Sequence, residues 1–200
     1  MFVETLWVEK YRPKTLADCV LPSRLKKTFT DIVKSGEIPN LLLCGSAGVG
    51  KTTIARAISS DLNMDVLFIN ASLENGIDVL RSRISQFASS MSLTGNKKLV
   101  ILDEADNMTT ALQTALRGFI EEFSKNCRFV LTGNFPQKII TPLHSRCSVI
   151  DFTLRDKEEK IESMSLFFKR ICTILELENV EFDKKSLPQL LTNIILIFDV

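Results

Sequence analysis

An eight-residue, glycine-containing segment constrains the fold of this chain more than any other feature of its sequence. Residues 45–52 read GSAGVGKT, a full match to the pattern G-x-x-x-x-G-K-[ST]. The segment directly follows an apolar run, Leu41–Cys44, and directly precedes a stretch with helical spacing. Such a loop binds phosphate groups when it lies between a strand and a helix, so the flanking residues disfavour a chance glycine-rich turn.

Each residue type in this P-loop has a physical task. Glycine lets the backbone fold tightly and point consecutive N–H groups at phosphate oxygens, while the helix N-terminus adds partial positive charge. We expect Lys51 to neutralise the terminal phosphates of ATP and Thr52 to offer its hydroxyl to Mg²⁺. The predicted phosphate-binding residues are Gly45, Ser46, Ala47, Gly48, Val49, Gly50, Lys51, Thr52 and Thr53.

The remainder of the chain alternates short apolar runs with longer stretches of helical spacing. This alternation is typical of parallel strands joined by crossover helices, so we expect an α/β fold with a five-stranded parallel sheet flanked by helices. The predicted strands are Leu41–Cys44, Val66–Asn70, Leu99–Asp103, Arg128–Thr132 and Ser148–Phe152. The predicted helices are Arg24–Ser35, with Gly36 at its C-cap, Lys51–Leu62, Ile77–Met91 and Thr110–Phe123.

Two adjacent carboxylates end the third predicted strand. Residues 99–106 read LVILDEAD, which places Asp103 and Glu104 at the carboxyl edge of the sheet, beside the P-loop. We expect Asp103 to hold Mg²⁺ through water and Glu104 to orient and deprotonate the attacking water, since phosphoryl transfer to water needs both tasks. An acidic pair is also common at solvent-facing strand ends, but the upstream P-loop disfavours that alternative.

Two other polar residues have more than one interpretation. Asn134, which follows the fourth predicted strand, could hydrogen-bond the γ-phosphate or the attacking water, or could simply form a turn. Arg146, in the triplet SRC before the last strand, could be a surface arginine, an arginine finger or one half of a buried ion pair. Spacing alone does not choose among these roles.

The pattern changes after residue 152. Arg155–Leu175 begins with charged residues and continues with apolar residues at three- and four-residue spacing, which indicates one amphipathic helix. We therefore expect two domains, a P-loop core over residues 1–152 and part of a helical lid over residues 153–200.

Composition excludes several other classes of protein. The 25 Lys and Arg residues nearly balance the 24 Asp and Glu residues, so any contact with nucleic acid depends on a local patch. Five dispersed cysteines and a single histidine argue against a disulfide framework and a zinc site. The sequence contains neither a signal-peptide pattern nor an apolar run long enough to cross a bilayer, so we expect no membrane partner and a place in the cytoplasm.

A set of motifs in fixed order carries a family resemblance. In chain order the motifs are VEKYRP (8–13), the P-loop (45–52), NAS (70–72), GIDVLR (76–81), DEAD (103–106), TGN (132–134) and SRC (145–147). Over residues 6 to about 180 the chain resembles AAA+ ATPases of the replication-factor-C type, especially the large clamp-loader subunits of T4-like phages. The resemblance implies a DNA-dependent ATPase that loads a sliding clamp onto primer–template DNA during replication, together with other clamp-loader subunits that form a pentamer in the family.

The resemblance also implies roles for individual residues. Asn134 would sense the γ-phosphate, and Asn70 would restrain Glu104 until DNA is bound. Arg146 would act in trans as an arginine finger on the ATP of a neighbouring subunit. The residues expected on the adenine side of the pocket are Val8, Tyr11, Arg12 and Pro13.

Contacts with DNA and with the clamp rest on surface residues. Arg81 matches a family position that meets the DNA backbone. Arg83, Lys97 and Lys98 could extend this phosphate-tracking strip or form an ordinary solvated face. Ile84, Phe87 and Met91 could insert into a clamp groove or belong to the core, and we favour the core for Ile84.

The last residues depart from the family pattern. The lid arginine motif and the helical collar of the family are missing, and residues 193–200 read NIILIFDV, which suggests a frameshift or premature stop. Two alternatives to a working clamp-loader subunit follow: a nucleotide-binding fragment that cannot assemble, and another AAA+ DNA-remodelling ATPase such as a branch-migration helicase. A viral origin, suggested by the resemblance, would place the chain in the host cytoplasm.

Overall fold

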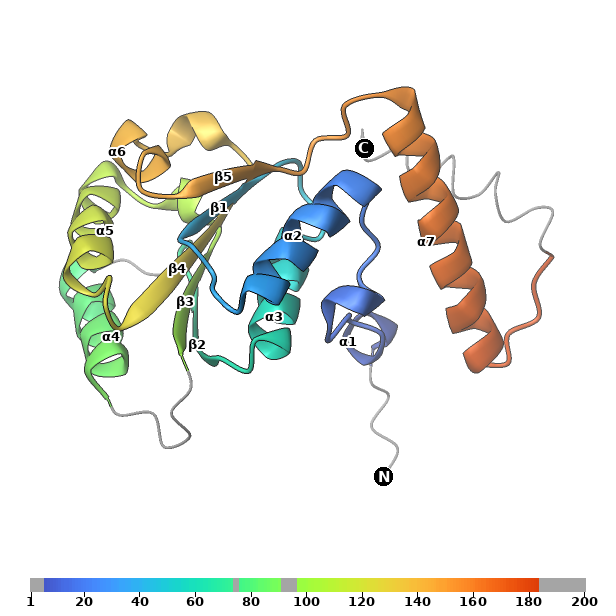
Figure 1. Ribbon diagram of the computed structural model, residues 1–200, viewed down its shortest axis with the longest axis horizontal. Helices are drawn as coiled ribbons and strands as arrows, with labels where there is room; N and C mark the ends of the chain where they lie inside the picture. Colours follow the sequence, from blue (N-terminus) through green and yellow to red (C-terminus); the bar gives the residue numbers. More distant parts are fainter. Residues whose placement is uncertain (1–5, 74–75, 91–96, 184–200) are drawn as a thin grey trace.

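The computed structural model describes residues 6–73, 76–90 and 97–183. Its centre is a five-stranded sheet in the order β2-β3-β4-β1-β5, in which every pair of neighbours is parallel (Figure 1). The strands are β1 (Leu41–Cys44), β2 (Asp65–Asn70), β3 (Lys98–Asp103), β4 (Cys127–Gly133) and β5 (Ser148–Asp151). The predicted α/β fold with a five-stranded parallel sheet is confirmed.

Helices cover both faces of the sheet. Figure 1 shows α4 and α5 against one face, α2 and α3 against the other, and α7 beyond α2 and α3, with α1 between α3 and α7. The helices are α1 (Trp7–Lys10), α2 (Ser23–Ser35), α3 (Lys51–Asp61), α4 (Ile77–Ser89), α5 (Thr110–Glu122), α6 (Thr141–His144) and α7 (Lys157–Leu177). Short 3₁₀ turns add η1 (Leu16–Asp18), η2 (Ala105–Asn107) and η3 (Pro136–Lys138).

Successive side chains of the strands enter two separate cores because the pleat alternates them between the faces. Leu42 and Val100 pack in the core beneath α4 and α5, while Leu41 and Leu99 pack in the core beneath α2 and α3. All four side chains are fully buried. Continuous apolar runs therefore suit β1 and β3, because both faces of these strands are buried.

The observed elements differ from the predicted ones by one or two residues at their ends. β4 extends to Cys127 and Gly133 because these residues still pair with β3 and β1, although neither belongs to the apolar run. α7 starts at Lys157 rather than Arg155, since the Asp156 side chain accepts a hydrogen bond from the Glu159 N–H and caps the helix. The short helices α1 and α6 were not predicted. Met91 and the tail at residues 193–200 lie outside the described residues.

Lys98 fits neither alternative considered for it, a phosphate-tracking strip or an ordinary solvated face. Lys98 begins β3 with 6% of its surface exposed, and its Nζ donates hydrogen bonds to the backbone oxygens of Phe87 and Ser90. Its ammonium group therefore caps the C-terminal end of α4 and is not available to bind DNA phosphates. Lys97 does remain exposed, with its Nζ 2.9 Å from the Gly36 oxygen.

The apolar residues of α4 divide between core and surface. Ile84 is fully buried, as we expected, and Phe87 is partly buried against the same core. Ile77 and Val79 are the exposed large apolar residues of this helix. A docking face on the described part of α4 would thus use its first turn rather than Ile84 and Phe87.

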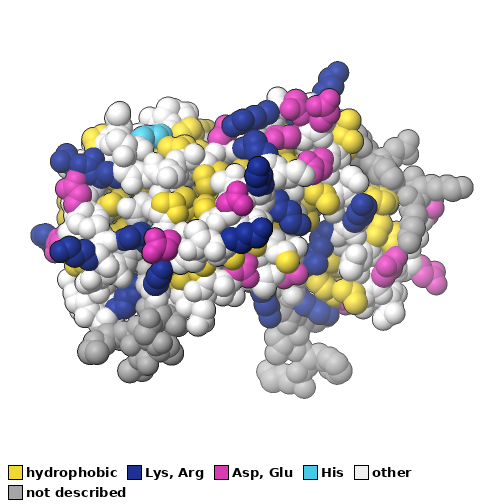
Figure 2. All heavy atoms as spheres, in the orientation of Figure 1, with side chains coloured by type: hydrophobic (Ala, Val, Ile, Leu, Met, Phe, Trp, Pro, Cys, Tyr) yellow, Lys and Arg dark blue, Asp and Glu magenta, His cyan; other side chains and the backbone are white. Residues whose placement is uncertain are grey.

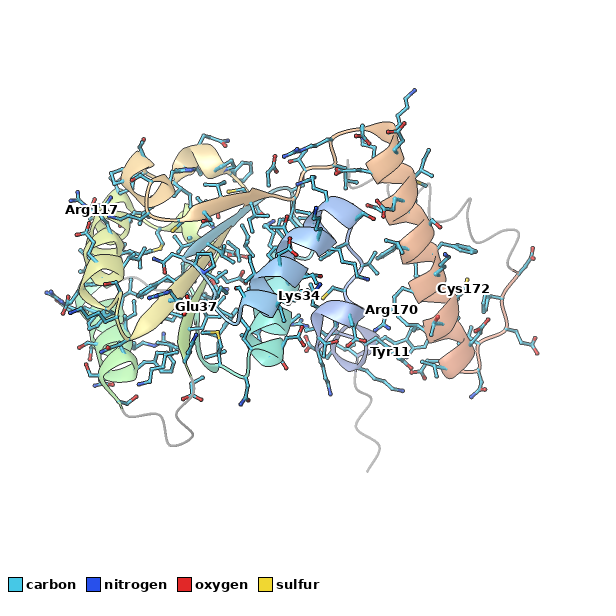
Figure 3. The ribbon with its side chains drawn as sticks, in the orientation of Figure 1. Tyr11, Lys34, Glu37, Arg117, Arg170 and Cys172 are labelled. Carbon is cyan, nitrogen blue, oxygen red and sulfur yellow. The ribbon has the colours of Figure 1, made fainter. Side chains whose placement is uncertain are left out.

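Several polar contacts join α7 to the rest of the chain, and none of its residues is fully buried. Arg24 Nε of α2 donates to Glu159 Oε1 at 2.7 Å, and Arg170 of α7 donates to the backbone oxygen of Tyr11 at 3.3 Å. Figure 3 shows Tyr11 and Arg170 facing each other between α1 and α7. Lys, Arg, Asp and Glu are mixed over the face drawn in Figure 2, so no single sign of charge dominates it.

We predict that Ile84→Ala destabilises the fold by about 2–5 kcal/mol, because it removes fully buried methyl groups and leaves a cavity. The matched control on the same helix is Val79→Ala, whose side chain is 55% exposed and whose loss should cost no more than about 0.5 kcal/mol. Urea unfolding followed by circular dichroism measures both. Equal effects of the two substitutions would contradict the assignment of Ile84 to the core.

Candidate functional site

The loop between β1 and α3 takes a conformation that needs glycine. Gly45, Gly48 and Gly50 have φ values of 144°, 80° and 91°, a region that other residues rarely adopt. A Cβ atom on Gly45 would also lie 2.9 Å from the Cβ of Phe152, closer than real contacts allow. The glycines therefore shape the loop that places the N-terminus of α3 at the carboxyl edge of the sheet.

Lys51 is the first residue of α3, and its side chain turns back into the loop. Only 7% of its surface is exposed, and its Nζ donates to Gly45 O at 2.7 Å, Ser46 O at 2.7 Å and Asn134 Oδ1 at 2.8 Å. Burial lowers the pKa of Lys51, while the Asp106 and Asp103 carboxylates oppose this shift. The structure thus brings together Lys51 and Asn134, which are far apart in the sequence.

Asp103 joins the P-loop helix to the ends of β3 and β4. Its Oδ1 accepts hydrogen bonds from Thr52 Oγ1 at 2.5 Å and from Thr132 Oγ1 at 2.6 Å. Thr132 in turn accepts a hydrogen bond from the backbone N–H of Glu104 at 3.1 Å. Thr132 was absent from the predicted site, and its position in the TGN motif, one strand away from Asp103, was the available signal.

Glu104 lies in the left-handed region, with φ 57° and ψ 42°. Residues other than glycine pay a cost for this conformation, and such residues cluster at functional sites. Its Oε2 is 3.4 Å from Asn107 Nδ2. This is a long contact, and the role of Glu104 in orienting water remains a prediction.

The donor set at this edge suits a magnesium–phosphate group. Thr52 Oγ1 and Asp103 Oδ1 are adjacent hard oxygen ligands, which Mg²⁺ prefers. Lys51 Nζ is held by two carbonyl oxygens and an amide oxygen, which phosphate oxygens could replace without leaving the ammonium unpaired.

Asn70 has different partners from those implied by the family resemblance. Its Oδ1 accepts hydrogen bonds from Ser72 N at 3.0 Å and Ser72 Oγ at 2.6 Å, so its amide oxygen shapes the turn after β2. Asn70 is paired in register with Asp103, one residue before Glu104. Its role as a restraint on Glu104 remains a prediction.

The VEKYRP segment contacts α7. Tyr11 Oη and Lys10 Nζ each lie 2.5 Å from Glu178 Oε1, and Arg12 pairs with Glu9 at 2.7 Å. The hydrogen bond from Lys10 lowers the pKa of Glu178, and the hydrogen bond to Glu178 raises the pKa of Tyr11. Val8 is exposed and Pro13 is half-buried. The adenine-side role of Val8, Tyr11, Arg12 and Pro13 stays a prediction.

Arg146 lies at the opposite edge of the sheet from the P-loop, because it precedes β5 whereas the P-loop follows the parallel strand β1. Its Nε donates to Glu121 Oε1 at 2.6 Å and its Nη1 donates to Pro142 O at 3.0 Å. The Arg146 guanidinium lowers the pKa of Glu121. A cavity of about 640 Å³ lies beside it, lined by Glu37, Ile38, Pro39, Asn40, Arg128, Ser145, Arg146, Cys147 and Ser148.

Arg81, the predicted DNA contact, is exposed on α4. Its Nη2 lies 3.7 Å from Glu122 Oε2, and its guanidinium lies 5.6 Å from the centre of the Phe119 ring. The side chain remains 62% exposed, so these contacts leave it accessible to a phosphate. Its DNA-binding role remains a prediction.

A glycine-shaped loop between a strand and a helix, with an acidic pair at the end of a neighbouring parallel strand, defines a P-loop nucleotide-binding protein. Comparison with protein families narrows the class of protein to which the chain belongs. Residues 41–154 match the AAA family, the ATPase family associated with various cellular activities, and the chain belongs to that family.

Individual relatives have names connected with DNA replication. The sliding-clamp-loader large subunit of Escherichia phage RB69 is 39% identical over 180 residues, covering 89% of this chain and 56% of the relative. The replication factor C small subunit of Staphylothermus marinus is 41% identical over 193 residues, covering 94% of this chain and 56% of the relative. The chain therefore spans a little more than half the length of these curated relatives.

A solved structure has the same fold. The Holliday junction branch migration motor RuvB of Thermotoga maritima matches with a TM-score of 0.70 and 22% identity, over 90% of this chain and 59% of that one. At this identity the likeness shows the fold alone. In the described part of this chain, no helix combines the length and apolar character needed to cross a membrane.

We predict that Thr132→Val destabilises the protein by about 1–3 kcal/mol, because the change leaves the Glu104 N–H without its partner and removes one donor to Asp103. Thr114→Val is the control: its hydroxyl donates to the Thr110 oxygen on an exposed helix face, and its loss should cost no more than about 0.5 kcal/mol. Thermal unfolding compares the two. A neutral Thr132→Val would show that this hydroxyl does not connect the two strands.

Proposed function

We propose that this chain is the ATPase subunit of a sliding-clamp loader, which uses ATP binding and hydrolysis to place a clamp on primer–template DNA during replication. Two findings support the proposal: the chain belongs to the AAA family, and its relatives at about 40% identity are named clamp-loader subunits. Its proposed partners are a sliding clamp, the DNA backbone and other clamp-loader subunits. A cytoplasmic location fits these partners.

Within this proposal the residues at the carboxyl edge bind ATP and Mg²⁺. The N–H groups of residues 45–53 and the Lys51 ammonium would hold the phosphates, and Thr52 and Asp103 would hold Mg²⁺. Glu104 would orient and deprotonate water, and Asn134 would hydrogen-bond the γ-phosphate. The hydrolysis reaction gives ADP and phosphate.

The observation that carries the proposal is the separation of Arg146 from these residues. The P-loop, Asp103 and Asn134 gather at the carboxyl edge, while Arg146 lies at the amino edge beside an open cavity. A single chain cannot bring the two together without unfolding its sheet. A neighbouring subunit that packs its carboxyl edge against this cavity would place its ATP near Arg146, which supports a finger acting in trans.

We also propose that residues 1–152 are the ATPase core and that residues 153–200 are part of a helical lid. The attachment of α7 supports this division, because Arg24 pairs with Glu159 and Tyr11 with Glu178, while no residue of α7 is fully buried. Such contacts allow a lid to shift relative to the core when a nucleotide binds.

The first test is ATP hydrolysis by this chain with and without its clamp, primed DNA and companion subunits. We expect turnover to rise with clamp and DNA and to vanish in Lys51→Ala, because no other ammonium group at the loop could neutralise the phosphates. Phosphate release measured with a coupled assay gives the rate. ATP binding with flat turnover under all conditions would instead support a nucleotide-binding fragment that does not assemble.

The trans role of Arg146 has its own test. Arg146→Ala should lower turnover by about 10³-fold or more in the assembled ATPase. If the finger acts between copies of this chain, mixing Arg146→Ala with Lys51→Ala should restore part of the turnover, because some interfaces then join an intact P-loop to an intact arginine. Arg155→Ala, which changes an exposed arginine away from the cavity, is the control. Turnover that stays normal in Arg146→Ala would contradict the role.

A further inference from the structure

Asp106 lies inside the candidate site but has none of the roles assigned above. Only 5% of its surface is exposed. Its Oδ2 accepts hydrogen bonds from the backbone N–H of Asn134 at 3.1 Å and of Phe135 at 3.0 Å. Because these are the first two residues after β4, the carboxylate holds the chain at the point where it leaves the sheet.

The position of the Asn134 side chain depends on that anchor. Asn134 Oδ1 accepts a hydrogen bond from Lys51 Nζ at 2.8 Å. A short connection therefore runs from the Asp106 carboxylate through the Asn134 backbone and side chain to the Lys51 ammonium.

The second oxygen of Asp106 shows that packing alone does not explain this residue. Oδ1 is buried and has no hydrogen-bond partner among the described residues. It lies beside Gly133, where a Cβ atom would approach it to 3.4 Å. A buried carboxylate oxygen without a donor lowers stability, so the two N–H groups bound by Oδ2 are the contacts that favour an acid at this place.

We propose that Asp106 is a positioning residue that holds Asn134 at the terminal-phosphate position, so that the site distinguishes a nucleoside triphosphate from a diphosphate. The inference rests on the proposed function, because it requires that ATP binds at the P-loop. The contacts of the Asp106 carboxylate are with the backbone N–H groups of Asn134 and Phe135. It acts by fixing the backbone that carries Asn134.

The test measures the affinities of the full 200-residue chain for ADP and for a non-hydrolysable ATP analogue, each with Mg²⁺, by isothermal titration calorimetry. Asp106→Ala should weaken binding of the analogue by about tenfold, the effect expected for one hydrogen bond to a charged group, and change ADP binding by less than about twofold. Asn134→Ala should show the same loss. The double variant should lose no more than either single variant, because both changes remove the same contact.

Three further variants separate positioning from a general structural role. Asp106→Asn, whose amide oxygen can still accept both N–H groups, should retain most of the preference for the triphosphate. Asp106→Ser, which is too short to reach both N–H groups, should lose it and serves as a second variant should Asp106→Ala not fold. Asp61→Ala is the control, since the Asp61 carboxylate accepts the Leu16 N–H at 2.8 Å away from the P-loop and its loss should leave the preference unchanged.

The possible outcomes are distinct. Equal weakening of both nucleotides in Asp106→Ala and Asp106→Ser, additive effects with Asn134→Ala, or an Asp106→Asn variant that loses the preference would overturn the positioning role. Tight ATP binding by the wild-type chain that is lost in Lys51→Ala, with an unchanged preference in both Asp106→Ala and Asp106→Ser, would overturn this inference and leave the proposed function intact. Absence of ATP binding by the wild-type chain would overturn both.

Discussion

The parallel pairing of the central strands is the constraint on which the site depends. β1 lies between β4 and β5, and Cys44 at its end is in register with Gly133 and with Asp151. The residues that follow these strands must therefore emerge at one edge of the sheet. For this reason the P-loop after β1 and Asn134 after β4 lie within hydrogen-bond reach of each other, although 83 positions separate Lys51 from Asn134.

Hydrogen bonds at this edge hold the polar groups ready for a charged ligand. Asp103 accepts from Thr52 and Thr132, and Lys51 donates to two carbonyl oxygens and to Asn134. Phosphate oxygens would exchange with these partners, so binding need not expose an unpaired ammonium. A site that is largely formed before binding loses less conformational entropy when the ligand arrives.

Sequence patterns predicted the local structure well and the partners of charged side chains poorly. The P-loop and the strand ending at Asp103 follow from short-range spacing, since a buried parallel strand needs a continuous apolar run and the loop needs glycines. Lys98 looks like a surface lysine in sequence, yet β3 places its side chain across the end of α4. The contact between Arg146 and Glu121 was equally hidden, because it joins two elements through the fold rather than through spacing.

The sequence by itself determined the fold class, the glycine-containing loop between β1 and α3 and the acidic pair, because glycine conformation, strand burial and helix periodicity are properties of neighbouring residues. The tertiary structure alone decided which polar groups meet across the sheet edge: Thr132 with Asp103, Asn134 with Lys51 and Asp106 with the backbone after β4. The tertiary structure also places Arg146 at the opposite edge of the sheet from the P-loop of its own chain. The physical reason is that strand order and register bring together residues that are remote in sequence. The spacing of neighbouring residues does not indicate which strands pair in the sheet.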